Sequence, residues 1–174
     1  MIEARAIIEN IEKTKEKVEE LGAEFKNDYA FKDIIFVPKK EDFNLSDDFV
    51  RVRVYSLTYW KTKNVVLVRK KTEFKEKDKI DKIILREEFD TKKEAFDFIS
   101  KNLAEFEKGF DYSRKGWEYH LDNKRIFIED IEGYKPSIEI EAKDEKELED
   151  LFDKIGIIEI VKESVPEIIR KLIK

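Results

Sequence analysis

The chain has 174 residues, with 36 Lys and Arg against 41 Asp and Glu, so its formal net charge is −5. This length suits one domain that buries its own core, and we expect a single domain over residues 1–174. The absence of cysteine excludes disulfides and thiolate metal sites, and the single histidine, His120, excludes a metal site built from several histidines. The net negative charge disfavours a general nucleic-acid partner.

The beginning of the chain lacks a basic segment followed by an apolar run, and no apolar stretch approaches the roughly 20 residues that span a bilayer. We therefore expect a cytoplasmic protein with no membrane partner. Abundant Lys, Glu and Ile, without Cys or Gln, is a composition typical of heat-adapted proteins.

Alternation of apolar and polar residues predicts that most of the chain is extended. It indicates strands at residues 3–8, 29–37, 50–55, 65–71, 82–90, 112–119, 124–131 and 137–142, and a short one at 157–161. Capping residues and apolar periodicity predict helices that begin after Asn10, Thr91, Asp144 and Ser164. About eight strands and four helices indicate an α+β fold with a mainly antiparallel sheet.

The charged residues of these strands recur at every second position, so each strand presents them on one face. Arg51 and Arg53 alternate with valines, and Glu139 and Glu141 alternate with isoleucines. The simplest interpretation is an antiparallel sheet with one face in water. A second interpretation is a sheet curled around a polyphosphate and a metal ion. The prevalence of Arg, which suits bidentate phosphate contacts, and of carboxylates on separate strands, which suit a hard divalent cation, favours the second.

The order of these motifs resembles the CYTH family, which includes class IV adenylyl cyclases and thiamine triphosphatases among the triphosphate tunnel metalloenzymes. The resemblance covers nearly the whole chain and rests on Leu21-Gly22-Ala23, Asp33-Ile34-Ile35-Phe36, Arg51-Val52-Arg53, Arg86-Glu87-Glu88 and Glu139-Ile140-Glu141. It implies a closed, mainly antiparallel β-barrel of about eight strands with flanking helices. The tunnel of such a barrel binds triphosphate through basic side chains and Mg²⁺ or Mn²⁺ through acidic ones.

Carried over position by position, the resemblance implies a role for individual residues. The implied triphosphate-binding residues are Arg5, Arg51, Arg53, Lys70, Arg86 and Arg114. The implied metal ligands are Glu3, Glu88, Glu129, Glu139 and Glu141, and the implied catalytic residues are Lys70, Glu139 and Glu141. The run Arg69-Lys70-Lys71 also allows Lys71 in place of Lys70.

The chain departs from the family pattern at two motifs. Met1 stands where the opening motif has its first Glu, with Arg5 in place of its Lys, and Tyr112 stands where a later motif has Lys. The implied activity is that of a metal-dependent triphosphatase or a class IV adenylyl cyclase. The substrate would be a nucleotide, thiamine triphosphate or inorganic triphosphate. The departures keep open a non-catalytic, polyphosphate-binding regulatory module, and a homodimer is also left open.

Two further expectations concern single residues. His120 follows Tyr119 at the end of a predicted hairpin, and we expect it to be structural or solvent-exposed. Arg51 and Arg53 are like-charged neighbours on one face. We therefore expect Arg53→Ala to leave the unliganded protein as stable as before, or slightly more stable.

Overall fold

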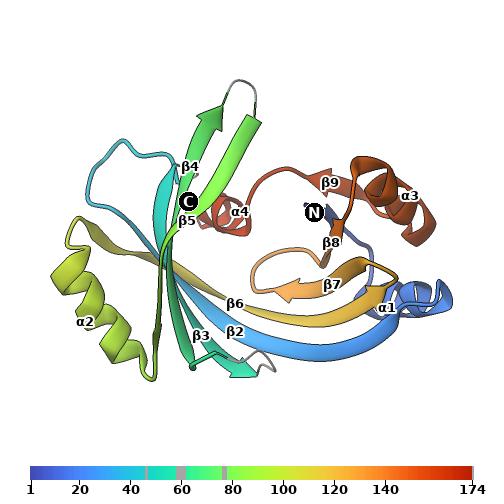
Figure 1. The fold of residues 1–174 in the computed structure, drawn as a ribbon, viewed down its shortest axis with the longest axis horizontal. Coiled ribbons are helices and arrows are strands. Elements are labelled where there is room, and N and C mark those ends of the chain that lie inside the picture. The colour runs from blue at the N-terminus through green and yellow to red at the C-terminus, as the bar shows by residue number, and fades with distance from the viewer. Residues whose placement is uncertain (46, 58–61, 76–77, 174) are drawn as a thin grey trace. The chain divides into compact units, whose positions relative to one another are not determined.

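A computed structural model of the chain describes residues 1–45, 47–57, 62–75 and 78–173, with side chains described outside 73–81. Over these residues it contains nine strands and four helices (Figure 1). In chain order they are β1 (Ile2–Ile7), α1 (Ile11–Glu20), β2 (Glu24–Pro38), β3 (Asp48–Leu57), β4 (Val65–Lys75), β5 (Asp78–Phe89), α2 (Lys92–Asn102), β6 (Phe106–Leu121), β7 (Lys124–Ile131), β8 (Ser137–Ala142), α3 (Glu145–Ile155), β9 (Glu159–Val161) and α4 (Val165–Leu172). The predicted α+β class is confirmed.

The strands form one sheet in the hydrogen-bonded order β5-β4-β3-β2-β6-β7-β8-β1-β9. The strand pairs β1–β8, β1–β9, β3–β4, β4–β5, β6–β7 and β7–β8 are all antiparallel, as the alternation predicted. The sheet has nine strands rather than eight, because the short β9 adds to β1 at one end of the order. No hydrogen bonds join the end strands β5 and β9 in the described part of the chain, so the expected closed barrel is not confirmed.

The chain divides into two compact units. Unit 1 comprises Met1–Ala30 and Arg114–Glu163, and unit 2 comprises Phe31–Ser113 and Ser164–Lys174. The long strands β2 and β6 each have one half in unit 1 and the other half in unit 2. The single domain expected from chain length stays a prediction.

The helices begin where the capping residues predicted. The side chains of Asn10, Thr91, Asp144 and Ser164 each accept a hydrogen bond from the backbone N–H three residues further on. Such a bond satisfies one of the first N–H groups of a helix, which have no partner within it. No helix within the described ranges is long and apolar enough to cross a membrane.

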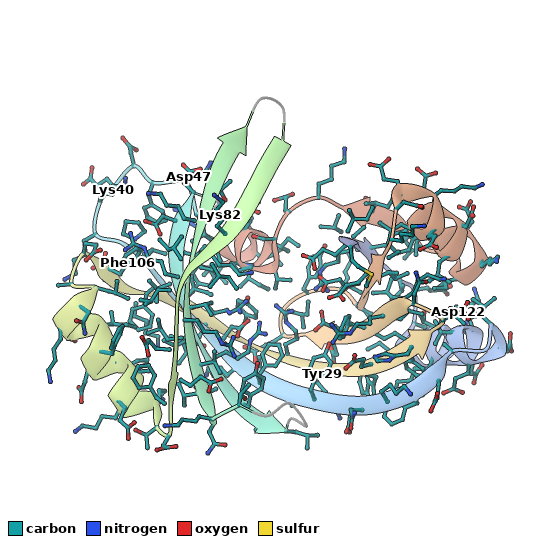
Figure 2. All side chains as sticks on the ribbon, viewed as in Figure 1. Tyr29, Lys40, Asp47, Lys82, Phe106 and Asp122 are labelled. Atoms are coloured by element: carbon teal, nitrogen blue, oxygen red, sulfur yellow. The ribbon has the colours of Figure 1, made fainter. Side chains whose placement is uncertain are left out.

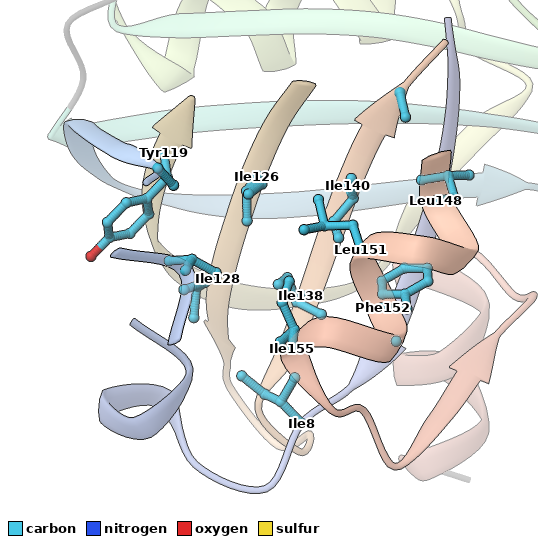
Figure 3. Packing of buried hydrophobic residues seen from close by; sticks show 14 residues of the cluster. Ile8, Tyr119, Ile126, Ile128, Ile138, Ile140, Leu148, Leu151, Phe152 and Ile155 are labelled. Carbon is cyan, nitrogen blue, oxygen red and sulfur yellow. The ribbon is translucent and has the colours of Figure 1, made fainter. Parts of the chain in front are cut away.

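The core of unit 1 lies on one face of its strands, under α1 and α3. Isoleucines of β7 and β8 pack there against apolar side chains of α3, as Figure 3 shows for Ile126, Ile128, Ile138, Ile140, Leu148, Leu151, Phe152 and Ile155. Because side chains alternate along a strand, burial of Ile138 and Ile140 turns Glu139 and Glu141 to the opposite face. This core therefore determines which face of unit 1 carries the charged residues.

The core of unit 2 follows the same pattern with α2. Val50 and Val52 of β3 and Val65 and Leu67 of β4 pack with Ala95, Ile99, Leu103 and Phe106 in one buried cluster. Arg51 and Arg53, which alternate with Val50 and Val52, consequently lie on the face away from α2.

Candidate functional site

The polar face of unit 1 is the sheet face opposite its core. It carries Glu3, Arg5, Arg114, Glu118, His120, Arg125, Glu129, Ser137, Glu139 and Glu141. Arg5 is buried at its centre, and its Nη2 lies 2.8 Å from Oε1 of Glu129 and 2.7 Å from Oε2 of Glu139. Nη1 of Arg5 donates to the hydroxyl of the buried Ser137 at 2.8 Å. Arg5 thus ties two strands together through two implied metal ligands.

The two carboxylates that share Arg5 have opposite pKa shifts. Burial alone would raise the pKa of Glu129, but the charges of Arg114 and Arg5, with a hydrogen bond from Tyr29, lower it to about 2. Burial raises the pKa of Glu139, and the neighbouring charges of Glu129 and Glu3 add to this while Arg5 opposes it. Glu129 is therefore firmly ionised, whereas Glu139 carries its charge at a cost.

Glu129 is held from a third direction by Tyr29 of β2, which is labelled in Figure 2. The hydroxyl of Tyr29 donates to Oε2 of Glu129 at 2.7 Å, and Nη1 of Arg114 lies 3.4 Å from both oxygens of the same carboxylate. Gly116 is the cross-strand neighbour of Glu129, and a Cβ at position 116 would overlap the Tyr29 ring. Glycine at this position is what lets the ring reach Glu129.

A second charged group on this face surrounds Glu118 of β6. Its Oε1 lies 2.7 Å from Nε2 of His120 and accepts a hydrogen bond of 3.0 Å from Nε of Arg125. Nη1 of Arg125 donates in turn to Oε2 of Glu141 at 3.2 Å. Arg125 thereby connects a buried carboxylate to an implied metal ligand.

The polar face of unit 2 carries Asp33, Arg51, Arg53, Lys70, Arg86 and Glu88. The register places Arg51 and Arg86 on either side of Val68, and Arg53 and Glu88 on either side of Val66. Residues flanking one strand in this way are roughly 10 Å apart at the backbone. Long basic side chains can converge over that distance.

Arg53 is held in place by Asp33 of β2. Its Nε and Nη2 donate to the two carboxylate oxygens of Asp33 at 2.7 and 2.9 Å, and its guanidinium lies 3.7 Å from the centre of the Phe31 ring. Asp33 is fully buried. The ion pair fixes the guanidinium plane on the face that also carries Arg51.

The consecutive basic residues of β4 separate onto two faces. Lys70 pairs across the strands with Phe49, which places it on the face of Arg51. Arg69 instead binds Asp48 through two hydrogen bonds and packs over Phe106 of the core. Lys71, the alternative to Lys70, shares the face of Arg69.

The implied metal ligands do not form a ready-made metal site. In the described part of the chain no three His, Asp or Glu residues are grouped so that they could hold a metal ion. Within unit 1, Glu129 and Glu139 bind Arg5, and Glu141 binds Arg125. Glu88 lies in unit 2, paired with Arg86 at 3.1 Å. The carboxylates are engaged by arginines, so the residues as arranged do not fit a preformed Mg²⁺ or Mn²⁺ site.

Sequence reasoning gave Tyr29 and Ser137 no role, and it used Asp33 only as part of the motif Asp33-Ile34-Ile35-Phe36. None of Tyr29, Asp33 and Ser137 belongs to a run of alternating charged residues. Their roles depend on partners that are distant in the sequence. Glu118 and His120 offered a usable signal, because residues two apart in a strand share a face.

Comparison with known proteins identifies the fold. No protein-family model and no curated protein matches the chain. Among solved structures, PH1819 from Pyrococcus horikoshii OT3 is 19% identical, with 98% of both chains covered and a TM-score of 0.75. The candidate adenylyl cyclase HpAC1 from Hippeastrum, described as having a dominant triphosphatase activity, is 15% identical over 97% of this chain and 94% of its own, with a TM-score of 0.68. A candidate adenylate cyclase from Vibrio parahaemolyticus is 10% identical, with 97% of both chains covered and a TM-score of 0.67.

These similarities define a class at the level of fold. The chain has the fold of proteins described as adenylyl cyclases and a triphosphatase, and the predicted resemblance to the CYTH family is confirmed to that extent.

Proposed function

We propose that the chain binds a triphosphate compound through the basic side chains on the polar face of unit 2 and hydrolyses the terminal phosphate. The observation that carries the proposal is the polar face of unit 2, where Arg51, Arg53, Lys70 and Arg86 lie together on the side away from the core. A polyanion can bind such a group of basic side chains through charge-assisted hydrogen bonds. The triphosphatase activity stated for HpAC1, which shares the fold, supports hydrolysis as the reaction.

Arg51 is a suitable residue for testing this binding by substitution. It shares a face with Lys70 and lies across β4 from Arg86. Arg53 is ion-paired with Asp33, and Arg5 is ion-paired with Glu129 and Glu139. A phosphate group must compete with these carboxylates at Arg53 and Arg5.

A non-catalytic polyphosphate-binding module is the second candidate, and one observation favours it. Arg5 holds Glu129 and Glu139 at 2.8 and 2.7 Å, which draws two implied metal ligands toward a guanidinium. A protein built this way can retain anion binding while its metal affinity is weak. Cyclisation of ATP, the activity in the names of two similar structures, is the third candidate.

Two measurements separate these candidates. The first is the melting temperature with inorganic triphosphate, ATP or thiamine triphosphate, each with EDTA, Mg²⁺ or Mn²⁺, against sulfate at matched ionic strength. The second is product analysis: orthophosphate indicates hydrolysis, pyrophosphate with cyclic nucleotide indicates cyclisation, and neither product indicates binding alone. Arg51→Ala should lose the triphosphate-dependent shift, and Arg69→Ala, on the opposite face of unit 2, should keep it. An unmoved melting temperature with every triphosphate would exclude all three candidates.

A further inference from the structure

The side chains on the polar face of β3 change in character along the strand. Because the valines of β3 pack in the core of unit 2, the alternate residues of the strand share the opposite, polar face. In chain order these alternate residues are Arg51, Arg53, Tyr55 and Leu57. The first two are cations, the third is a partly exposed aromatic residue, and the fourth is an aliphatic residue that is 46% exposed. All four belong to unit 2, so their arrangement depends on one strand within one unit.

The ring of Tyr55 contacts the same phenylalanine that Arg53 covers. It lies edge-to-face with Phe31, with the ring centres 5.6 Å apart and the planes at 75°. Phe31 is buried, and the guanidinium of Arg53 lies 3.7 Å from the centre of its ring. Asp33 holds that guanidinium through two hydrogen bonds. Packing and ion pairing thus orient the aromatic ring and the cation before any ligand binds.

The apolar end of this row lies outside the cores of the protein. Within the described residues, neither Tyr55 nor Leu57 belongs to the apolar cluster of unit 2 or to that of unit 1. A strand position that faces solvent in an antiparallel sheet is ordinarily polar. An aromatic and an aliphatic side chain beside two arginines instead form a surface on which a planar ring can stack.

The spacing of the row suits a molecule that joins phosphates to a ring. Alternate residues of a strand are roughly 7 Å apart, so Tyr55 lies roughly 7 Å beyond Arg53 at the backbone and roughly 14 Å beyond Arg51. When phosphates bind the arginines, the sugar or equivalent linker of an organic triphosphate can span the distance from Arg53 to Tyr55. Inorganic triphosphate has no group that extends beyond its phosphates.

We propose that Tyr55 and Leu57 form a subsite for the aromatic ring of an organic triphosphate. The inference rests on the proposed function, because Arg51 and Arg53 supply the phosphate contacts. The Tyr55 ring stacks on the ring of the ligand, and Leu57 adds apolar contact at the end of the strand. Stacking does not depend on one particular base, because every base has a π-face. The ligand class is therefore a triphosphate ester with a planar heteroaromatic ring, for which ATP and thiamine triphosphate are the probes.

The affinities for three ligands test the subsite. Calorimetry in one buffer with EDTA gives the Kd for ATP, thiamine triphosphate and inorganic triphosphate. Tyr55→Leu keeps an apolar side chain and removes the ring, so it should weaken binding of a ring-bearing triphosphate by roughly 5- to 150-fold, the usual effect of losing one stacked base. Its affinity for inorganic triphosphate should stay at the wild-type value. Weakening for ATP alone would assign the subsite to nucleosides, and weakening for thiamine triphosphate alone would assign it to thiamine.

Phe25→Leu is the matched control for Tyr55→Leu. Phe25 is an aromatic residue of unit 1 that is 48% exposed and lies edge-to-face with Tyr119, with the ring centres 5.5 Å apart. Its substitution removes a partly exposed ring from a similar aromatic pair, away from the arginines of β3. We expect Phe25→Leu to bind all three ligands as the wild type does.

Two outcomes would overturn the inference and leave the proposed function standing: an equal loss of affinity for all three ligands in Tyr55→Leu, or no loss for any. If Tyr55→Leu does not fold, the wild type provides the test by NMR. We expect a nuclear Overhauser effect between the ring protons of Tyr55 and those of bound ATP or thiamine triphosphate, with the Tyr55 signals assigned by their loss in Tyr55→Phe. The absence of this effect in both saturated complexes would overturn the inference. Absence of binding by all three triphosphates would overturn the proposed function together with it.

Discussion

Arg53 binds Asp33 through two hydrogen bonds, from Nε to Oδ1 at 2.7 Å and from Nη2 to Oδ2 at 2.9 Å. Asp33 is fully buried, so this guanidinium neutralises a carboxylate that has no access to water. From the sequence we expected Arg51 and Arg53 to repel each other, so that Arg53→Ala would not destabilise the protein. The ion pair with Asp33 argues against that expectation. Arg53 has a structural role in unit 2 as well as an implied role in anion binding.

We therefore predict that Arg53→Ala destabilises the unliganded protein by about 3–5 kcal/mol, the usual effect of removing one member of a buried charge pair. Chemical denaturation measures this. Arg86→Ala is the control, because Arg86 and Glu88 are both substantially exposed and such pairs contribute about 0–1 kcal/mol. Equal stability losses in the two variants would contradict the distinction between a buried and an exposed pair.

The second prediction concerns acid sensitivity. The pKa of Glu129 in the folded protein is about 2, below the ordinary value of 4.5, because Arg114 and Arg5 outweigh the effect of burial. A lowered folded-state pKa means that this carboxylate stabilises the protein above pH 4.5 and that the contribution is lost as pH falls from 4.5 toward 2. Glu129→Gln should be less stable than the wild type at pH 7. The two proteins should converge in stability on acidification.

The convergence is measured by thermal unfolding at several pH values. The control is Glu132→Gln, which alters an exposed carboxylate shortly after Glu129 and should track the wild type throughout. A constant stability difference between Glu129→Gln and the wild type across this range would show that Glu129 is not held ionised by its neighbours.

The third prediction tests the contact between Tyr29 and Gly116. Gly116→Ala should displace the Tyr29 ring and destabilise the protein by about 1–3 kcal/mol, as overpacking does. Tyr29→Phe removes only the hydroxyl that binds Glu129, with an expected cost of about 1.5–3 kcal/mol for a hydrogen bond to a charged group. If the alanine acts by displacing this hydroxyl, the effects of the two changes should not add in the double variant. Full additivity would mean that the glycine matters for another reason.

The alternation of residues predicted which side chains share a face, but not which of them bind one another. Glu139 and Glu141 lie away from the core because Ile138 and Ile140 enter it, and that follows from the period of a strand. The partner of Arg5 is 134 positions away at Glu139, and that of Tyr29 is 100 positions away at Glu129. Such contacts depend on strand order and register, which a single sequence determines weakly.

For the implied metal site, too, the sequence did not predict which side chains bind one another. Acidic residues on several strands suggested a divalent cation, yet in unit 1 the nearest charges to Glu129 and Glu139 belong to Arg5. The residue types on one face of a sheet do not show whether its carboxylates bind a metal ion or neutralise arginines. The pair of Glu118 and His120, in contrast, could have been found by asking which residue shares a face with the single histidine.

The last prediction separates Glu139 and Glu141 as metal ligands from the same residues as counter-ions. Burial and the charges of Glu129 and Glu3 raise the pKa of Glu139, so its ionised form is disfavoured in the folded protein. A raised folded-state pKa in a carboxyl group means a stabilising contribution at low pH that is lost as pH rises through that pKa. Glu139→Gln should therefore be neutral or mildly stabilising at pH 7, in contrast to Glu129→Gln.

If Glu139 and Glu141 instead hold a metal when triphosphate binds, either Gln variant should abolish metal-dependent turnover while triphosphate still shifts the melting temperature in EDTA. Because Met1 replaces one implied acidic residue, we expect weak metal affinity, low activity and better turnover with Mn²⁺ than with Mg²⁺. Turnover of both variants across a titration of each metal measures this. Arg125→Gln is the matched control for Glu141, since it removes the ion pair at 3.2 Å and leaves the carboxylate in place. Undiminished turnover in both Glu variants would show that Glu139 and Glu141 are only counter-ions of the arginines.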